Sequence, residues 1–247
     1  MALNIYAGGD SMRDALVFNG ASNLDFLEIR TNVVRIPEVV ARIREAQAIW
    51  DTVSSQPLDL ANFISSEDAY FLSNIKLKSF AAAVVQVGLL DRYLKTHSLA
   101  EFMIGAVNGD SPLKVALGQL SFFDMIAESP VLGGVKLVAV PPLGAAGELP
   151  VLAGVQLAEF AVFRKGEDGE YRRLSVDTRE VEKMIASLVD DFEVRKIVMV
   201  GPGNTLLNHA SSVIAERDVQ LLESIDLDPM LSWFWSRLKE TRLAIAN

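Results

Sequence analysis

The stretch Phe102–Pro112, FMIGAVNGDSP, constrains the fold more than any other part of this 247-residue chain. An apolar run leads into Gly105 and Gly109, which free the backbone for a sharp turn. Asp110-Ser-Pro112 follows, and these residue types cap and open a helix. The pattern therefore predicts a strand, a tight turn and a helix, which is the geometry of a nucleophile elbow.

The middle of such a turn holds the reactive side chain above the sheet, at the start of the helix. In this chain the middle residue is Val107, flanked by Ala106 and Asn108. An aliphatic side chain has no atom that can be acylated. The sequence thus predicts an elbow that lacks its nucleophile.

Three segments carry a family resemblance. Gly105-Ala-Val-Asn-Gly-Asp110 resembles the Gly-His-Ser-Leu-Gly-Glu elbow of the malonyl-CoA:acyl-carrier-protein transacylase (acyltransferase) family, with Val107 at the place of the acylated serine. Ile5–Met12 resembles the family's Phe-Pro-Gly-Gln-Gly-Ser-Gln, and Ile197–Asn204 resembles its strand followed by Gly-Pro-Gly. The chain is identified as a degenerate, inactive member of that family.

One α/β domain over residues 1–247 is expected, because a chain of this length with 50% hydrophobic residues can form one large core. Short apolar strands alternate with helices, which predicts a mostly parallel sheet with Ile5, Ile104 and Val198 on central strands and the glycine turns at one edge. The resemblance implies an acyltransferase-like (α/β-hydrolase-like) fold. It also implies a small subdomain, which looks reduced or rebuilt within 135–190.

Apolar spacing predicts amphipathic helices over 33–50 and 79–94, and Gly88 within the second helix indicates close packing. Further elements are predicted as follows: a first strand at 3–7, a short helix at 57–66, helices at 113–117 and 121–128, the latter capped by Ser121, a strand at 135–140, a hairpin joining 155–164 to 170–176, a helix from 178 capped by Asp177 or Thr178, strands at 196–200 and 219–222, and helices at 205–215 and 228–243.

The loop Gly8-Gly9-Asp10 is the expected counterpart of the family's oxyanion loop, in which a glutamine helps to form the oxyanion hole. Gly9 has no side chain to donate a hydrogen bond, and Asp10 would bring negative charge towards a developing oxyanion. A simple strand-to-helix turn is the preferred interpretation of these residues.

Two further parts of the family's site are missing from the sequence. The family pairs the malonyl carboxylate with an arginine after the elbow, but no arginine lies between Arg92 and Arg164. The chain has two histidines: His97 falls in a polar connection, and His209 lies on a predicted helix past the position of the family's base. The resemblance therefore implies that both the carboxylate clamp and the general base are lost.

These losses predict a catalytically inactive protein with a binding, regulatory or scaffold role, in the fatty-acid or polyketide setting that the resemblance implies. Acyl carrier protein, acyl-CoA or a biosynthetic protein is the implied partner, and no cofactor or metal is predicted. One alternative is an active acyltransferase or hydrolase that uses other residues, such as Ser11 or Ser111. Another is a scaffold that docks through its hairpin or through Trp233 and Trp235.

Charge and composition narrow the partners. A formal net charge of -9 disfavours binding to nucleic acid. Acyl carrier proteins are acidic as well, so docking needs a local basic patch, for which Lys76 with Lys78 or Arg172 with Arg173 are the compact candidates. The chain has no cysteine, which excludes disulfides and thiolate metal sites and fits a cytoplasmic protein. No apolar run is long enough to span a membrane.

Overall fold

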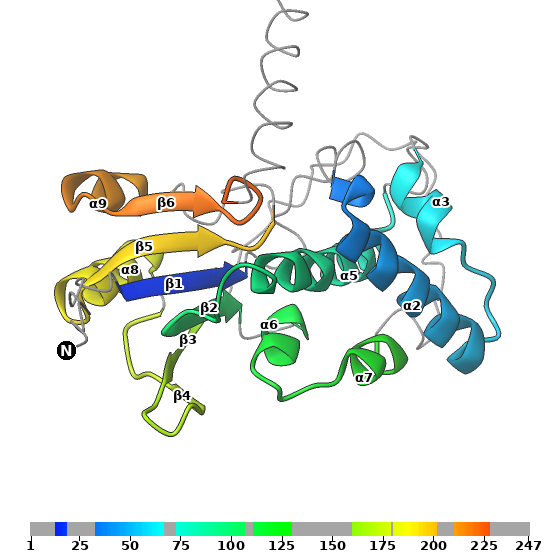
Figure 1. Ribbon diagram of the computed structural model, residues 1–247, viewed down its shortest axis with the longest axis horizontal. Coiled ribbons are helices and arrows are strands. Elements are labelled where there is room, and N and C mark those ends of the chain that lie inside the picture. Colours follow the sequence, from blue (N-terminus) through cyan, green and yellow to red (C-terminus); the bar gives the residue numbers. More distant parts are fainter. Residues whose placement is uncertain are drawn as a thin grey trace, which may run out of the picture.

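The computed structural model describes residues 13–18, 33–66, 73–106, 111–129, 160–178, 180–201 and 210–227. Within this part of the chain a six-stranded sheet is flanked by helices (Figure 1). Its strands are β1 (Arg13–Phe18), β2 (Phe102–Ala106), β3 (Phe160–Lys165), β4 (Tyr171–Arg173), β5 (Val194–Met199) and β6 (Gln220–Glu223). The helices are η2 (Val33–Arg35), α2 (Pro37–Val53), α3 (Leu60–Ser65), α5 (Ile75–Leu94), α6 (Ser111–Ala116), α7 (Phe122–Ala127), α8 (Val181–Asp190) and α9 (Ser211–Glu216).

The strands follow the order β4-β3-β2-β1-β5-β6. β1 runs parallel to both β2 and β5, and β6 runs parallel to β5. β3 is antiparallel to β2, and β4 is antiparallel to β3. The predicted α/β class is therefore confirmed, with Ile104 and Val198 on central strands as expected.

The strand between β2 and β5 corrects one prediction. That place belongs to β1, residues 13–18, and not to residues 3–7; Ile5 lies outside the described residues. Only Ala15–Phe18 are buried, and this apolar run of four is too short to stand out in the sequence. The strand begins with two charged residues, and the Asp14 carboxylate accepts a hydrogen bond from the backbone N–H of Glu101 at 3.2 Å.

The core lies on both faces of the sheet, because successive side chains of a strand point to opposite sides. Leu16 and Phe18 of β1 belong to a cluster that includes residues of α2, α3, α5, α6 and α7. Ala15 and Val17 belong to a second cluster, which includes residues of α8 and α9. The sheet is thus the middle of three layers.

Helix α5 differs from the amphipathic helix that the sequence predicts. All of residues 80–90 are buried, so water does not reach any side of its middle. It crosses α2 closely at Gly88, where an added Cβ would lie 2.6 Å from the Cα of Val39. The prediction that Gly88 indicates close packing is therefore confirmed.

Local signals predicted several connections well. Ser121 caps α7 by accepting a hydrogen bond from the Asp124 N–H. The hairpin of β3 and β4 is confirmed, and Gly169 turns in it with φ 85°. The capping prediction for α8 was wrong, because the helix begins at Val181 after Glu180, which makes no side-chain cap bond. Leu174 and Val176 pack against the second core cluster, which places the helix start beyond Asp177 and Thr178.

Arg42 of α2 joins three helices. Its guanidinium bonds the Asp91 carboxylate of α5 at 2.5 and 3.2 Å and lies 4.5 Å from the centre of the Phe122 ring of α7. It also pairs with Glu45 at 2.9 Å. The hydrogen bond to Asp91 is the main cause that raises the pKa of Arg42.

Glu38 should make the stability of the protein depend on acid pH. Its side chain is only 8% exposed and lies beside Lys95 and Arg92 at the end of α5. Burial alone would raise its pKa, but the hydrogen bond from Lys95, a backbone N–H and the two cationic charges outweigh burial and lower the pKa below 4.5. A lowered folded-state pKa stabilises the fold above the unfolded pKa, and this stabilisation is lost as the pH falls through the folded value.

We therefore expect Glu38→Gln to be less stable than the wild type at pH 7, by roughly 1 kcal/mol. The gap should shrink as the pH falls below the ordinary value of 4.5, because glutamine does not titrate. Urea unfolding of both proteins from pH 3 to 7 measures this. An unchanged gap at pH 3 would contradict the assignment.

Candidate functional site

The strand and the helix predicted on either side of the elbow are present. β2 ends at Ala106 and α6 begins at Ser111, so four residues connect the strand to the helix. Gly105 is buried and pairs with Phe18 of β1. Val107, Asn108, Gly109 and Asp110 lie outside the described residues. The position that needs a nucleophile therefore follows directly from a buried central strand.

The elbow shares one edge of the sheet with two other strand ends. Val17 is level with Ile104 of β2 and with Met199 of β5, and the N–H of Val200 donates to the Val17 carbonyl at 2.9 Å. Beyond β5 the chain turns at Gly201, whose φ of 120° favours glycine. Ligands of parallel α/β sheets bind at this carboxyl edge, which makes it the first candidate site.

Gly8, Gly9 and Asp10, the predicted oxyanion loop, lie outside the described residues. The strand that adjoins the elbow strand is β1, and the chain continues from it at Asn19. Whatever segment faces the elbow from this strand therefore begins ten residues later than Gly9. In the sequence, the glycine pair Gly8-Gly9 is a stronger signal than the short apolar run Ala15–Phe18 that precedes this segment.

Two buried polar side chains lie at the end of β5. Gln86 of α5 is completely buried, and its side-chain N–H donates to the Val200 carbonyl at 3.0 Å. Ser224, 6% exposed, is held by its backbone N–H, which donates to the Met199 carbonyl at 2.8 Å. Among the described residues, neither the Gln86 carboxamide oxygen nor the Ser224 hydroxyl has a hydrogen-bond partner. Sequence reasoning missed both, although a glutamine inside the run AAAVVQVGLL was a usable signal.

His97, the histidine in the described part of the chain, does not lie at this edge. His97 precedes the start of β2, while the elbow follows its end, so the length of the strand, about 16 Å, separates them. Its ring stacks on Tyr93 with centroids 4.6 Å apart, and Nδ1 lies 2.8 Å from the Thr96 hydroxyl. His97 is thus half-buried by an aromatic neighbour rather than simply solvated. His209 lies outside the described residues.

The tyrosines with strongly shifted pKa values lie near the opposite edge. Burial is the main cause that raises the pKa of Tyr93 and Tyr171 to about 12, and the charge of Asp14, near the start of β1, adds to the shift. The Tyr171 hydroxyl donates to the Ala100 carbonyl at 2.5 Å. The Tyr171 hydrogen bond holds β4 against the segment that precedes β2. The alternative nucleophile Ser111 begins α6 and is half-buried, and Ser11 lies outside the described part.

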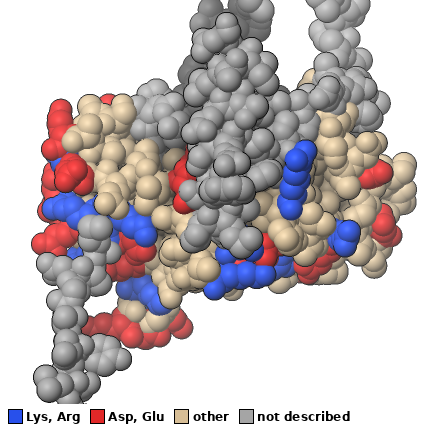
Figure 2. All heavy atoms as spheres, turned by 45° about the horizontal axis from the view of Figure 1, so that its top comes forward, with Lys and Arg blue, Asp and Glu red and all other residues tan. Residues whose placement is uncertain are grey.

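The two predicted basic pairs differ in their surroundings. Lys76 and Lys78 lie in the first turn of α5, which extends past the carboxyl ends of the strands (Figure 1). Arg172 and Arg173 lie on the edge strand β4, where Arg172 pairs with Asp168. Figure 2 shows basic and acidic side chains interspersed along the border of one face. The described residues along this border therefore form no uniform basic area.

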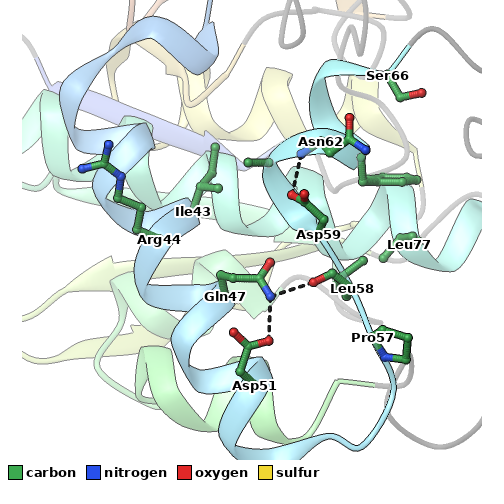
Figure 3. Close-up of a pocket in the computed structure, with 12 residues that line it drawn as sticks. Ile43, Arg44, Gln47, Asp51, Pro57, Leu58, Asp59, Asn62, Ser66 and Leu77 are labelled. Carbon is green, nitrogen blue, oxygen red and sulfur yellow. Dashed lines mark hydrogen bonds between the residues drawn. The ribbon is translucent and has the colours of Figure 1, made fainter.

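A groove of about 890 Å³ lies between α2 and α3, and the sequence did not predict it (Figure 3). The side-chain N–H groups of Gln47 donate to the Asp51 carboxylate at 2.8 Å and to the Leu58 carbonyl at 2.7 Å. Its carbonyl oxygen accepts from the Leu60 N–H at 2.8 Å. Gln47 thereby fastens the 57–60 segment to α2 and shapes the groove.

The described part of the chain contains neither a membrane-spanning helix nor a cluster of metal-ligating side chains. Within it, no helix combines the length and apolar character needed to cross a membrane. The same residues contain no group of three or more histidine, aspartate or glutamate side chains arranged to hold a metal ion.

Comparison with known proteins identifies the fold. No protein-family model matches the sequence, and no curated protein does either. The structure is similar to an acyl carrier protein S-malonyltransferase from Vibrio cholerae, with a TM-score of 0.53 and 12% identity, over 85% of this chain and 96% of that one. It is also similar to a malonyl CoA-acyl carrier protein transacylase from Clostridium perfringens, with a TM-score of 0.52 and 13% identity, over 95% of this chain and 100% of that one. The protein therefore has the acyltransferase-like α/β fold.

Proposed function

We propose that this protein is a non-catalytic acyltransferase-fold protein with a binding or regulatory role. The observation that carries the proposal is Val107, which directly follows Ala106, the last residue of β2, at the place where this fold presents its nucleophile. A site without its nucleophile retains at best a small residual rate. The two elbow glycines, Gly105 and Gly109, are present while the nucleophile is not, which supports a binding role.

We infer that the oxyanion loop corresponds to the residues after β1 rather than to Gly8-Gly9-Asp10. Phe18-Asn19-Gly20-Ala21 follows this strand and resembles the Phe-Pro-Gly-Gln of the malonyl transacylases. In this match Ala21 occupies the glutamine position, and alanine has no polar side chain. The glutamine of the family is thus replaced in either match. In the second match Asp10 is not part of the loop.

The clamp and the base support the same proposal. No arginine lies between Arg92 and Arg164 in the sequence, and Arg164 itself is engaged by Glu101 at the amino end of β2, at 2.9 Å. A malonyl carboxylate would therefore lack the cation that pairs with it in the resembled family. His97 lies at the wrong end of β2.

The partner is proposed from the fold alone. The named substrates of the two similar structures include acyl carrier protein and malonyl-CoA. A protein of this fold that binds without reacting would recognise acyl carrier protein, acyl-CoA or another biosynthetic protein. The exposed Lys76, at the end of α5 that extends past the carboxyl edge, offers a cation to an acidic carrier. A cytoplasmic location and a single domain over 1–247, with a reduced subdomain within 135–190, remain predictions.

An active enzyme that uses other residues is the second candidate. Ser111 favours it, because its half-buried side chain begins α6 on the elbow side. A serine at the start of a helix commonly serves as a cap. No histidine of the described residues lies beside Ser111. A scaffold that docks through the hairpin is the third candidate.

Intact-mass measurement tests the proposal. After incubation with malonyl-CoA or acetyl-CoA, we expect no acyl adduct on the wild type. Val107→Ser should also give no useful transfer to acyl carrier protein, because the other parts of the site are missing and members of a triad act as a unit. A catalytic transacylase assayed in parallel is the positive control. Stable acylation of the wild type would overturn the proposal.

A further inference from the structure

The groove between α2 and α3 has the dimensions of a small-molecule site. Its volume of about 890 Å³ falls within the range of about 300–1,000 Å³ that is common for ligand pockets. Its lining comes from α2, α3, the 57–59 segment, Ser66 and Leu77 of α5, and it includes no residue of the predicted elbow. Its apolar lining consists of Ile43, Pro57, Leu58, Ala61, Phe63 and Leu77.

The charged side chains that line the groove give it a polarity. Asp51 and Asp59 contribute carboxylates, and Arg44 is the cation among the lining residues. Figure 3 shows Gln47 and Asp51 directed towards the 57–59 segment, whereas the Arg44 guanidinium extends away from α3. Seven residues separate Arg44 from Asp51 on α2, which is about 10 Å along the helix. The Asp51 end of the groove is therefore negative.

Within the described part of the chain, the Oδ1 atom of each carboxylate accepts a hydrogen bond from a neutral amide. Asp51 Oδ1 accepts from Gln47 at 2.8 Å, and Asp59 Oδ1 accepts from the Asn62 N–H at 2.9 Å. Both donors are neutral amides, so the negative charges of Asp51 and Asp59 are not cancelled by them. A cationic group placed against these carboxylates would gain charge-assisted hydrogen bonds.

We propose that this groove binds a small amphiphilic cation, with its apolar body on Pro57, Leu58 and Ala61 and its amino head group at Asp51. This inference does not rest on the proposed function of the elbow. It predicts a preference for charge that apolar burial alone would not give.

Three octyl probes test the preference, because they share one apolar body and differ in the head group: octylammonium, octanol and octanoate. Titrations followed by NMR of the whole protein at pH 7 give the dissociation constants. We expect octylammonium to bind about tenfold more tightly than octanoate, with octanol between them. Shifted resonances should map to α2, α3 and the 57–59 segment.

Two sets of variants locate the effect. The double variant Asp51→Asn, Asp59→Asn removes the charges and keeps a capping side chain at 59, so the preference for the cation should fall to about twofold or less. Ala61→Phe places an aromatic ring on an exposed lining position and should abolish binding of all three probes. Val53→Phe is the matched control, since Val53 is exposed on α2 outside the groove.

Each outcome of these titrations either supports the proposal or overturns it. Tighter binding of octylammonium that is lost in both lining variants and kept in Val53→Phe supports the proposal. Equal or tighter binding of octanoate, binding that survives Ala61→Phe, or no binding of any probe at millimolar concentration overturns it. None of these results depends on acylation at the elbow, so this proposal and the proposed function fail independently.

Discussion

Gln86→Glu is expected to destabilise the protein at pH 7 by about 3–5 kcal/mol, because it places a carboxylate in a fully buried position. The new side chain has nearly the same shape but, when ionised, cannot donate to the Val200 carbonyl that the glutamine now bonds. Two negatively polarised oxygens would face each other without water. The effect should exceed that of removing the hydrogen bond alone.

Acid pH provides the diagnostic for this variant. Burial raises the pKa of this carboxyl, and a protonated glutamic acid can donate to the Val200 carbonyl, so the lost stability should return progressively as the pH falls from 7 towards the ordinary glutamate pKa of about 4.3. Gln86→Met is the matched control: it leaves the carbonyl unpaired, should cost about 1–3 kcal/mol, and should show no recovery of its own at acid pH. Chemical denaturation of the three proteins from pH 4 to 8 measures this. A Gln86→Glu variant that is no less stable than Gln86→Met at pH 7 would contradict the buried geometry.

Gly88→Ala is expected to destabilise the protein by about 1–3 kcal/mol, although alanine is the better helix former by about 1 kcal/mol. The added Cβ would lie 2.6 Å from the Val39 Cα, which is a backbone atom, so α2 and α5 must move apart. Their separation would loosen the pairs between Arg42 and Asp91 and between Glu38 and Arg92.

Thermal and urea unfolding measure the change at Gly88. Lys76→Ala, at an exposed position of the same helix, is the control and should leave stability nearly unchanged. Adding Val39→Ala removes a Cγ2 contact at 3.1 Å but not the backbone contact, and should restore only part of the loss. Full restoration by Val39→Ala would show that the side chain rather than the backbone limits the crossing.

Local chemistry explains which parts of the fold the sequence predicted. Ser121 bonds its own helix start, and the turn at Gly169 needs a positive φ, so both signals act within a few residues. The strand and helix around the elbow are likewise separated by only four residues. Such features depend little on the rest of the chain, which is why the strand and the helix on either side of the elbow could be predicted.

Features that depend on distant neighbours were missed. β1 is short, and what makes Ala15–Phe18 a central strand is the pairing with β2 and β5 on either side. The middle of α5 is buried all round, and part of this burial comes from α2, which packs closely at Gly88. The groove exists only because α2 and α3 meet at the hydrogen bonds of Gln47. None of these contacts has a signature in neighbouring residues.

The candidate site divides in the same way. The strand exits at Gly105 and Gly201 were predicted from glycine patterns and lie at one edge of the sheet. Gln86 reaches this edge from a helix 114 positions away from its partner Val200, so only the structure brings them together. Two glycine-containing segments follow short apolar runs within the first 20 residues, so the sequence alone offers two candidates for the oxyanion loop.

The antiparallel β3 makes part of this protein exchangeable as a unit. Ala106, the last residue of β2, pairs with Phe160, the first residue of β3, so the chain leaves the sheet and returns to it at adjacent points about 5 Å apart. Within this excursion α6 and α7 place Leu113 and Ile126 in the core. The pairing of β2 with β3 fixes where the chain leaves the sheet and where it returns, whatever the length of chain between these two points. An insertion or a deletion between α7 and β3 is therefore compatible with an unchanged strand register.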